Sequence, residues 1–250
     1  ILTHSFNLGK LYNVKEIGTI AAKANINAKG LTIDDLRTEI KADISSFEIL
    51  DYKYNDINVK GVLQKNLFDG TASINDENIR ANYAGDINFN DAVPHFDFDV
   101  MLSHAKLNEL KFLDEKSDLS LKLSVHGKAT SIDDFSGSIK ADSIYYTQND
   151  LNYFMDSVVL RSSHNNQQKH ITFNSDVADA DLSGNFYLSH IPDIFYSLMA
   201  EVMPKKIRPK DSYNISEHEN LKFTFNLKDI SVIIMAGGKG TRLRPYTEVL

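Results

Sequence analysis

The sequence predicts a mainly β protein, built as a repetitive antiparallel meander with two short helices and ending in a segment of a different kind. Three observations lead to this prediction. Apolar and polar residues alternate through most of the chain up to residue 228, Asn, Asp and Gly separate the runs, and parts of the sequence recur after 99 residues. Because successive side chains of a strand point to opposite faces, the alternation indicates a sheet with one apolar and one polar face.

The clearest strand is predicted at residues 79–90, where Ile, Ala, Tyr, Gly, Ile and Phe fall on one face and mostly polar residues on the other. The same alternation predicts further strands at residues 19–30, 96–102, 119–126 and 221–228. Between the runs, Asp69-Gly70, Asn75-Asp76 and Asn90-Asp91 suit tight turns between antiparallel strands.

Two short helices are expected where apolar residues recur at helical spacing. The first covers residues 105–113 and directs Leu107 and Leu110 inward. The second covers residues 191–202, and a Pro-Asp pair stands where it would begin. Residues 205–219 are polar and are expected to form a loop.

An internal repeat appears when the chain is compared with itself. Three pairs of segments share an offset of 99 residues, namely 32–36 with 131–135, 40–43 with 139–142, and 81–86 with 180–185. In the third pair Gly85 falls on Gly184. Three matches in one register predict two β units, residues 1–113 and 114–204, followed at 205–229 by a loop and a further strand.

A sheet with one apolar face needs a cover, and two short helices are too small to supply it. The sheet can close as a sandwich or barrel, stack as a β-solenoid, or curl into an open groove with an apolar lining. The pattern alone favours the closed forms, because most apolar faces belong to a core.

Composition sets further limits on the 250-residue chain. Its net charge of −7 disfavours nucleic acid as a partner, and the absence of Cys excludes disulfides and thiolate metal sites. No apolar run reaches the ~20 residues of a membrane-spanning helix. Because the chain starts at Ile1 rather than Met and stops at Leu250 inside a motif, we expect a fragment of a longer protein.

Residues 8–228 resemble the translocation-and-assembly-module (TamB) family, related to AsmA-like proteins, and in particular its Bacteroidetes-type members. The segments that carry the likeness are Gly18 to Gly30, Asn66 to Ala72, Ala84 to Ile87, and Ser175-Asp176 followed by Ala180 to Gly184. The resemblance implies a curled β-sheet groove that crosses the periplasm from an inner-membrane anchor. It also implies roles in moving phospholipid between the inner and outer membranes and in outer-membrane protein assembly.

The body, residues 1–229, shows no catalytic apparatus, and we expect a non-enzymatic cell-envelope segment without cofactors, whose partners are phospholipid and the outer-membrane assembly machinery. No His pair has the spacing of a zinc site. The acidic residues Asp176, Asp179 and Asp181 could bind a hard cation, although solvated positions of a strand explain them better. Seven aromatic residues could line a ligand groove or form ordinary core pairs: Tyr145, Tyr146, Tyr153, Phe154, Phe173, Phe186 and Tyr187.

The last twenty residues abandon the alternation. Residues 231–235 form a continuous apolar run, as in a parallel strand that is buried on both faces, and a loop with three glycines and basic residues follows. Such a loop lets backbone amides approach phosphate. Gly237, Gly238, Gly240, Thr241 and Arg242 closely resemble the N-terminal signature of sugar-1-phosphate nucleotidyltransferases, which make NDP-sugars from NTP and a sugar phosphate.

The second resemblance implies nucleotide binding by the glycine loop, a catalytic role for Arg242, Mg2+ and NTP as cofactors, and a cytoplasmic enzyme with a Rossmann-like fold. The chain ends before the rest of the signature, so residues 230–250 are expected to be a truncated and inert start of that fold. The two resemblances belong to different compartments, and no linker separates them. We therefore expect a chimeric chain joined near residues 228–231, with the complete enzyme as the alternative.

Overall fold

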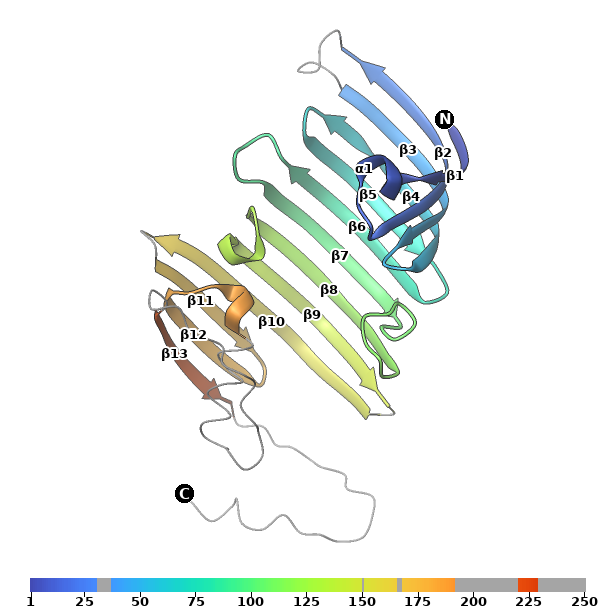
Figure 1. The fold of residues 1–250 in the computed structure, drawn as a ribbon. Helices are drawn as coiled ribbons and strands as arrows, with labels where there is room; N and C mark the ends of the chain where they lie inside the picture. Colours follow the sequence, from blue (N-terminus) through green and yellow to red (C-terminus); the bar gives the residue numbers. More distant parts are fainter. Residues whose placement is uncertain (31–36, 150, 166–167, 192–219, 229–250) are drawn as a thin grey trace, which may run out of the picture.

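The computed structural model describes residues 1–30, 37–149, 151–165, 168–191 and 220–228, which form one antiparallel sheet of thirteen strands (Figure 1). The strand order in the sheet is the order in the chain, so each strand pairs with the strand before it and the strand after it. The predicted mainly β meander is therefore confirmed.

The strands are β1 (Leu2–Asn7), β2 (Ile17–Lys29), β3 (Arg37–Ile49), β4 (Tyr52–Gln64), β5 (Leu67–Asn75), β6 (Ile79–Asn88), β7 (His95–Ala105), β8 (Ser117–Lys128), β9 (Ser136–Gln148), β10 (Leu151–Asn165), β11 (Gln168–Ser175), β12 (Ala178–Asn185) and β13 (Asn220–Leu227). Within the described residues three short helices accompany them: α1 (Leu8–Tyr12), η1 (Ile132–Asp134) and η2 (Leu188–His190). All five strands predicted from alternation are present, and their ends lie within two residues of those expected, except that β7 ends three residues later.

The sheet is open. β1 forms one edge and β13 the other, with the eleven remaining strands between them in a single layer (Figure 1). The described residues thus do not form the closed sandwich or barrel that the alternation alone favoured. Closure would require the two edge strands to pair, and they lie at opposite ends of the strand order.

Strand positions follow the 99-residue offset seen in the sequence. β3 and β9 are both thirteen residues long and start at Arg37 and Ser136, and β6 and β12 start at Ile79 and Ala178. The offset corresponds to six strands along the sheet. The sheet continues without a break across the expected unit boundary, since β7 pairs directly with β8, and the boundary itself stays a prediction.

Two local predictions are wrong. Residues 107–111 form turns instead of a helix, because the bond of helical spacing from Leu110 N to Lys106 O is followed by bonds of other spacings, from Lys111 N to Asn108 O and from Phe112 N to Leu107 O. Leu110 is nevertheless buried, as expected. Asp69-Gly70 lies inside β5 rather than in a turn, and the preceding turn is at Lys65. The predicted helix at 191–202 and the loop at 205–219 fall almost entirely outside the described residues.

Candidate functional site

The apolar face of the sheet is built from rows of directly paired residues that cross the strands. One row crosses from β2 to β10, and a second crosses from β2 to β13. The first row is Ala24, Ala42, Val59, Ala72, Tyr83, Val100, Leu123, Ala141 and Val158; the second is Ile26, Ile40, Gly61, Gly70, Gly85, Phe98, Val125, Ile139, Leu160, Phe173, Ala180 and Phe225. Every member of both rows is apolar, apart from the Tyr83 hydroxyl.

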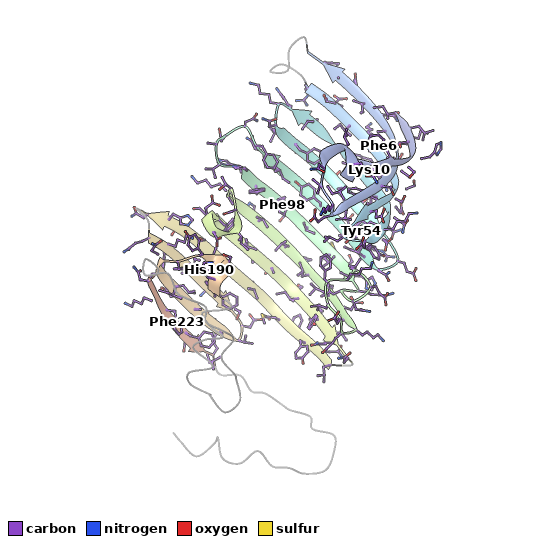
Figure 2. The ribbon with its side chains drawn as sticks, in the orientation of Figure 1. Phe6, Lys10, Tyr54, Phe98, His190 and Phe223 are labelled. Atoms are coloured by element: carbon purple, nitrogen blue, oxygen red, sulfur yellow. The ribbon has the colours of Figure 1, made fainter. Side chains whose placement is uncertain are left out.

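Little of this face is buried. Within the described part of the chain the buried hydrophobic residues are Ala105, Leu110, Val125, Phe135, Ile171, Ala178 and Phe186. The other side chains of the two rows are partly or largely accessible; Ile26, for example, is 48% exposed and Phe225 is 55% exposed. A soluble protein rarely leaves so long an apolar surface without a cover, so this face is the main candidate for binding. Side chains project from the whole length of the sheet in Figure 2.

A small cover exists near the ends of β8 to β12. The ring of Phe135, which follows η1, lies over Gly127, where an added Cβ would come within 2.8 Å of it. Asp133 of η1 accepts hydrogen bonds from Ser189 of η2, at 2.9 Å from the amide and 3.1 Å from the hydroxyl. The backbone amide of Ser189 is the main reason that the pKa of Asp133 is lowered. The joined helical turns shelter one corner of the apolar face, Ala105 and Leu110 are buried at the other end of the strands, and most of the two rows stays accessible.

The opposite face is polar and carries ion pairs between neighbouring strands. His126 Nδ1 lies 2.7 Å from Asp97 Oδ1, and His170 Nε2 lies 2.7 Å from Asp181 Oδ2. Each of these four side chains is at least half exposed, so water screens the pairs and each contributes little to stability. This face keeps the sheet hydrated, and polar side chains such as Asn58, Ser73 and Asn82 line a shallow hollow on it.

The predicted acidic cluster is divided among separate partners. Asp179 pairs with Lys228, Asp181 pairs with His170, and a carboxylate oxygen of Asp176 accepts from the backbone amide of Asp156. A search of the described residues for groups of His, Asp and Glu able to hold a metal ion finds none. The structure therefore does not bring these three carboxylates together around a common centre.

A buried carboxylate, which the sequence did not single out, joins the start of β4 to the turn between β5 and β6. Asp76 is 5% exposed, and it accepts hydrogen bonds from Tyr52 Oη, from Asn55 N (3.0 Å) and Nδ2 (2.9 Å), and from Asn78 N (2.9 Å). Burial alone would raise the pKa of Asp76, but these bonds outweigh it and lower the pKa. Burial and the bond to Asp76 together raise the pKa of Tyr52 to about 12.

The aromatic residues named from the sequence do not share one groove. At the end of the β9–β10 hairpin, Tyr145 pairs with Phe154 and Tyr146 pairs with Tyr153, and the ring centroids are 4.6 Å and 6.0 Å apart. Adjacent pairs in a ladder point to opposite faces. Because Tyr146 is also opposite Leu119, the Tyr146–Tyr153 pair lies on the apolar face, and Tyr145 and Phe154 lie on the polar face.

The other aromatic residues lie elsewhere. Phe173 stands in the second apolar row, between Leu160 and Ala180. Phe186 is 1% exposed and belongs to the small cover, whereas Tyr187 is 50% exposed. Of the seven, Phe173, Tyr146 and Tyr153 can therefore contribute to a binding surface on the apolar face.

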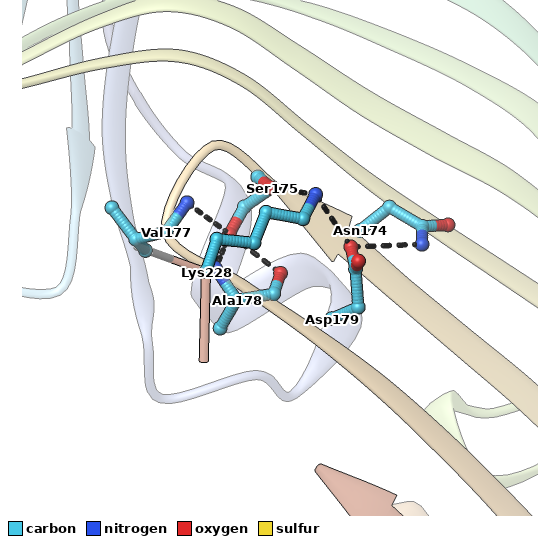
Figure 3. A network of polar contacts seen from close by, with 6 residues as sticks. All are labelled: Asn174, Ser175, Val177, Ala178, Asp179 and Lys228. Atoms are coloured by element: carbon cyan, nitrogen blue, oxygen red, sulfur yellow. Dashed lines mark hydrogen bonds and ion pairs between the residues drawn. The ribbon is translucent and has the colours of Figure 1, made fainter. Parts of the chain in front are cut away.

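The C-terminal edge strand is fastened by a polar network (Figure 3). Lys228 Nζ lies 2.8 Å from Asp179 Oδ1 and donates to Ser175 O at 2.6 Å, while Lys228 N donates to Val177 O at 3.0 Å. Asn174 Nδ2 donates to the same carboxylate at 3.1 Å. The hydrogen bond from Lys228 is the main reason that the pKa of Asp179 is lowered. Lys228, the residue after β13 and next to the expected junction, is therefore held against the β11–β12 turn.

The predicted nucleotide-binding residues Gly237, Gly238, Gly240, Thr241 and Arg242 lie outside the described residues, so the structure tests neither their arrangement nor the Rossmann-like start.

Comparison of the chain with family models, with curated proteins and with solved structures finds no match. Of the helices that the structure describes, none has the length and apolar character needed to cross a membrane.

Proposed function

We propose that this chain is a segment of a non-enzymatic cell-envelope protein whose apolar sheet face carries phospholipid between the inner and outer membranes. The observation that carries the proposal is the second apolar row, which runs without a polar side chain from β2 to β13. The resemblance of residues 8–228 to TamB and AsmA-like proteins supports a periplasmic location, an inner-membrane anchor in the full-length protein and a role in outer-membrane protein assembly.

The direction of the rows suits lipid transport. Neighbouring strands lie about 4.8 Å apart, so the second row, which crosses the twelve strands from β2 to β13, gives a path of roughly 53 Å across the sheet. This length is about twice the ~30 Å hydrocarbon core of a bilayer. An acyl chain that lies along the second row meets no polar side chain at any strand, because the row consists of apolar residues and of the glycines Gly61, Gly70 and Gly85.

The polar character of the opposite face also supports the proposal. A sheet that is apolar on both faces would aggregate or enter a membrane, whereas here each apolar position alternates with a hydrated one. Lipid would therefore be held on one face only, with water against the other.

The proposal is tested by a pair of substitutions at neighbouring positions of β7. Val100 lies in the first apolar row, and Met101, which is 51% exposed, lies on the polar face opposite Lys122. Val100→Glu places a charge in the lipid path and should abolish the phospholipid that co-purifies with the chain, as measured by mass spectrometry. Met101→Glu adds the same charge on the other face and should leave the lipid in place.

Phospholipid-free wild-type protein that also fails to take up added phospholipid would overturn the proposal. Equal lipid content in the two variants would also contradict it, because lipid would then be bound without regard to face. Far-ultraviolet circular dichroism of both variants checks that the sheet is retained.

The alternative function, nucleotidyl transfer, depends only on the glycine loop. A nucleoside triphosphate with Mg2+ should leave the melting temperature of the 250-residue chain unchanged. A clear rise that is lost in Arg242→Ala would favour the enzyme.

A further inference from the structure

The end of the β9–β10 hairpin exposes aromatic residues that lipid transport along the apolar face does not use. Tyr145 is 55% exposed and Phe154 is 53% exposed, and both lie on the otherwise polar face. Tyr153 on the apolar face is 52% exposed, and Leu151 at the start of β10 is 60% exposed. The hairpin end thus carries exposed aromatic side chains on both faces, and the exposed Leu151 stands next to its polar turn.

The hairpin also projects beyond the next strand. β11 pairs with β10 only as far as Val158, where Ser175 is the partner, so residues 151–157 of β10 have no β11 partner (Figure 1). At about 3.3 Å per residue this free edge is roughly 20 Å long. The pairing of β10 with β11 ends at that point, where the Asp176 carboxylate accepts hydrogen bonds from the backbone amides of Asp156 and Ser157. The projecting end is therefore accessible on both faces and along the outer side of β10.

The chemistry of this end restricts its partner. Between Ile144 and Met155 the one residue that is charged at neutral pH is Asp150. Beside the turn, Glu115 accepts hydrogen bonds from Gln148 and Asn149. Lys106 and Lys116 line the same hollow as Thr147 and Asn149, together with Glu109 and Asp118. Charges of both signs therefore stand beside the turn, and a neutral surface suits it better than an anionic one.

We propose that the end of the β9–β10 hairpin inserts into the interfacial region of a zwitterionic phospholipid bilayer. A flat protein surface would cover one face of the hairpin and leave the other in water, whereas the interfacial layer of a bilayer surrounds it. Tyrosine suits this layer, because its ring is apolar and its hydroxyl stays hydrated. This contact goes beyond lipid transport on the sheet, since Tyr145 and Phe154 do not lie on the transport face.

The chain contains no Trp, so a single introduced Trp reports on its own surroundings without background. Phe154→Trp places the reporter in the hairpin end. Phe89→Trp is the matched control, because Phe89 is 54% exposed in the β6–β7 loop at the opposite end of the strands. With phosphatidylcholine vesicles we expect a blue shift of the emission for Phe154→Trp and none for Phe89→Trp.

A second experiment removes the aromatic side chains. The double variant Tyr145→Ser with Phe154→Ser should lower the partition of the chain onto phosphatidylcholine vesicles about tenfold or more, because two large apolar side chains are lost from the contact. Circular dichroism of the double variant serves as the control that its sheet is retained. The variant should keep any phospholipid that co-purifies with the sheet, so failure of this inference is distinguishable from failure of the transport proposal.

Four outcomes would overturn the inference. One is the absence of a blue shift for Phe154→Trp, and another is an equal shift for both reporters. A third is partition onto phosphatidylglycerol vesicles alone, which would assign binding to charge. The fourth is self-association of the wild-type chain that the double variant abolishes, which would assign the hairpin end to a second copy of the chain.

Discussion

Replacing Asp76 by Asn tests whether the buried carboxylate holds the start of β4 against the β5–β6 turn. In the structure one carboxylate oxygen accepts from Tyr52 Oη and Asn78 N, and the other accepts from Asn55 N and Nδ2. An Asn side chain has one oxygen, so its amide nitrogen must face one of these two sets of donors. Either orientation leaves a backbone amide without its acceptor.

The expected cost follows from these bonds. An unsatisfied buried donor costs about 1–3 kcal/mol, and the loss of charge from the remaining bonds adds to it. We therefore expect Asp76→Asn to lower the free energy of unfolding by about 2–4 kcal/mol in urea titrations followed by circular dichroism. Tyr52→Phe removes one donor and leaves the carboxylate three partners, so it should cost about 1 kcal/mol.

The double variant completes a thermodynamic cycle. Because Tyr52 and Asp76 share a hydrogen bond, their effects should be non-additive by at least 0.5 kcal/mol, which is the order found for residues in contact. Additive effects, or a loss below about 0.5 kcal/mol for Asp76→Asn, would show that the network does not hold these elements together. The dependence of stability on acidic pH gives an independent check. Because the pKa of Asp76 is lowered from 3.8, the ionised carboxylate stabilises the fold at pH values above 3.8, and this stability is lost as the pH falls through the lowered pKa. Asp76→Asn should remove that part of the acid dependence.

Three further predictions concern pH, the edge strand and a glycine. The pKa of Tyr52 is raised from 10.0 to about 12, so the unfolded chain loses this proton at a lower pH than the folded chain. The wild type should therefore lose about 1–2 kcal/mol of stability between pH 10 and pH 12, and Tyr52→Phe should not. Lys228→Met removes the contacts to Asp179 and Ser175, and amide hydrogen exchange should accelerate in residues 220–227 while β3 to β9 are unchanged; acceleration throughout would refute a local role. Gly85 has a φ of +144°, and an added Cβ would lie 2.2 Å from a backbone oxygen. Gly85→Ala should therefore lower the free energy of unfolding in urea by about 1–3 kcal/mol, whereas the exposed control Ala84→Ser should leave it almost unchanged.

The main features of the fold could be predicted because each strand carries its own signal. Alternation located five strands, and the 99-residue offset related Gly85 to Gly184, both of which have positive φ. The form of the sheet could not be predicted in the same way. Alternation shows that a face is apolar but not what covers it, and whether a sheet closes depends on twist and on the pairing of its edges.

The hairpin aromatics show why a site can be missed when its residues are known. Ile139 and Ala141 lie on the apolar face, so strict alternation would place Tyr145 there as well. Ser143 instead has a φ of +52°, and the β8–β9 register shifts by one residue at this point. This bulge moves Tyr146 onto the apolar face and Tyr145 onto the other. A serine gives no sequence signal for such a bulge.

The Asp76 network was missed for a related reason. Asp76 is 24 residues from Tyr52 and 21 from Asn55 in the sequence, and each of the three is an ordinary residue for a strand end or a turn. Only the pairing of β4 with β5 brings them together. A signal for this contact would have required knowledge of the register, which alternation alone does not give.

The agreement between strand order and chain order has a consequence for how such a molecule can vary. Among the described strands each pairs only with its neighbours in the order, so adding or deleting a block of six strands leaves every other pairing as it was. One 99-residue unit then lengthens the sheet by about 29 Å, which is close to the thickness of a hydrocarbon core. The span of the apolar path is therefore a modular quantity, which duplication can match to the distance that must be crossed without redesigning a core.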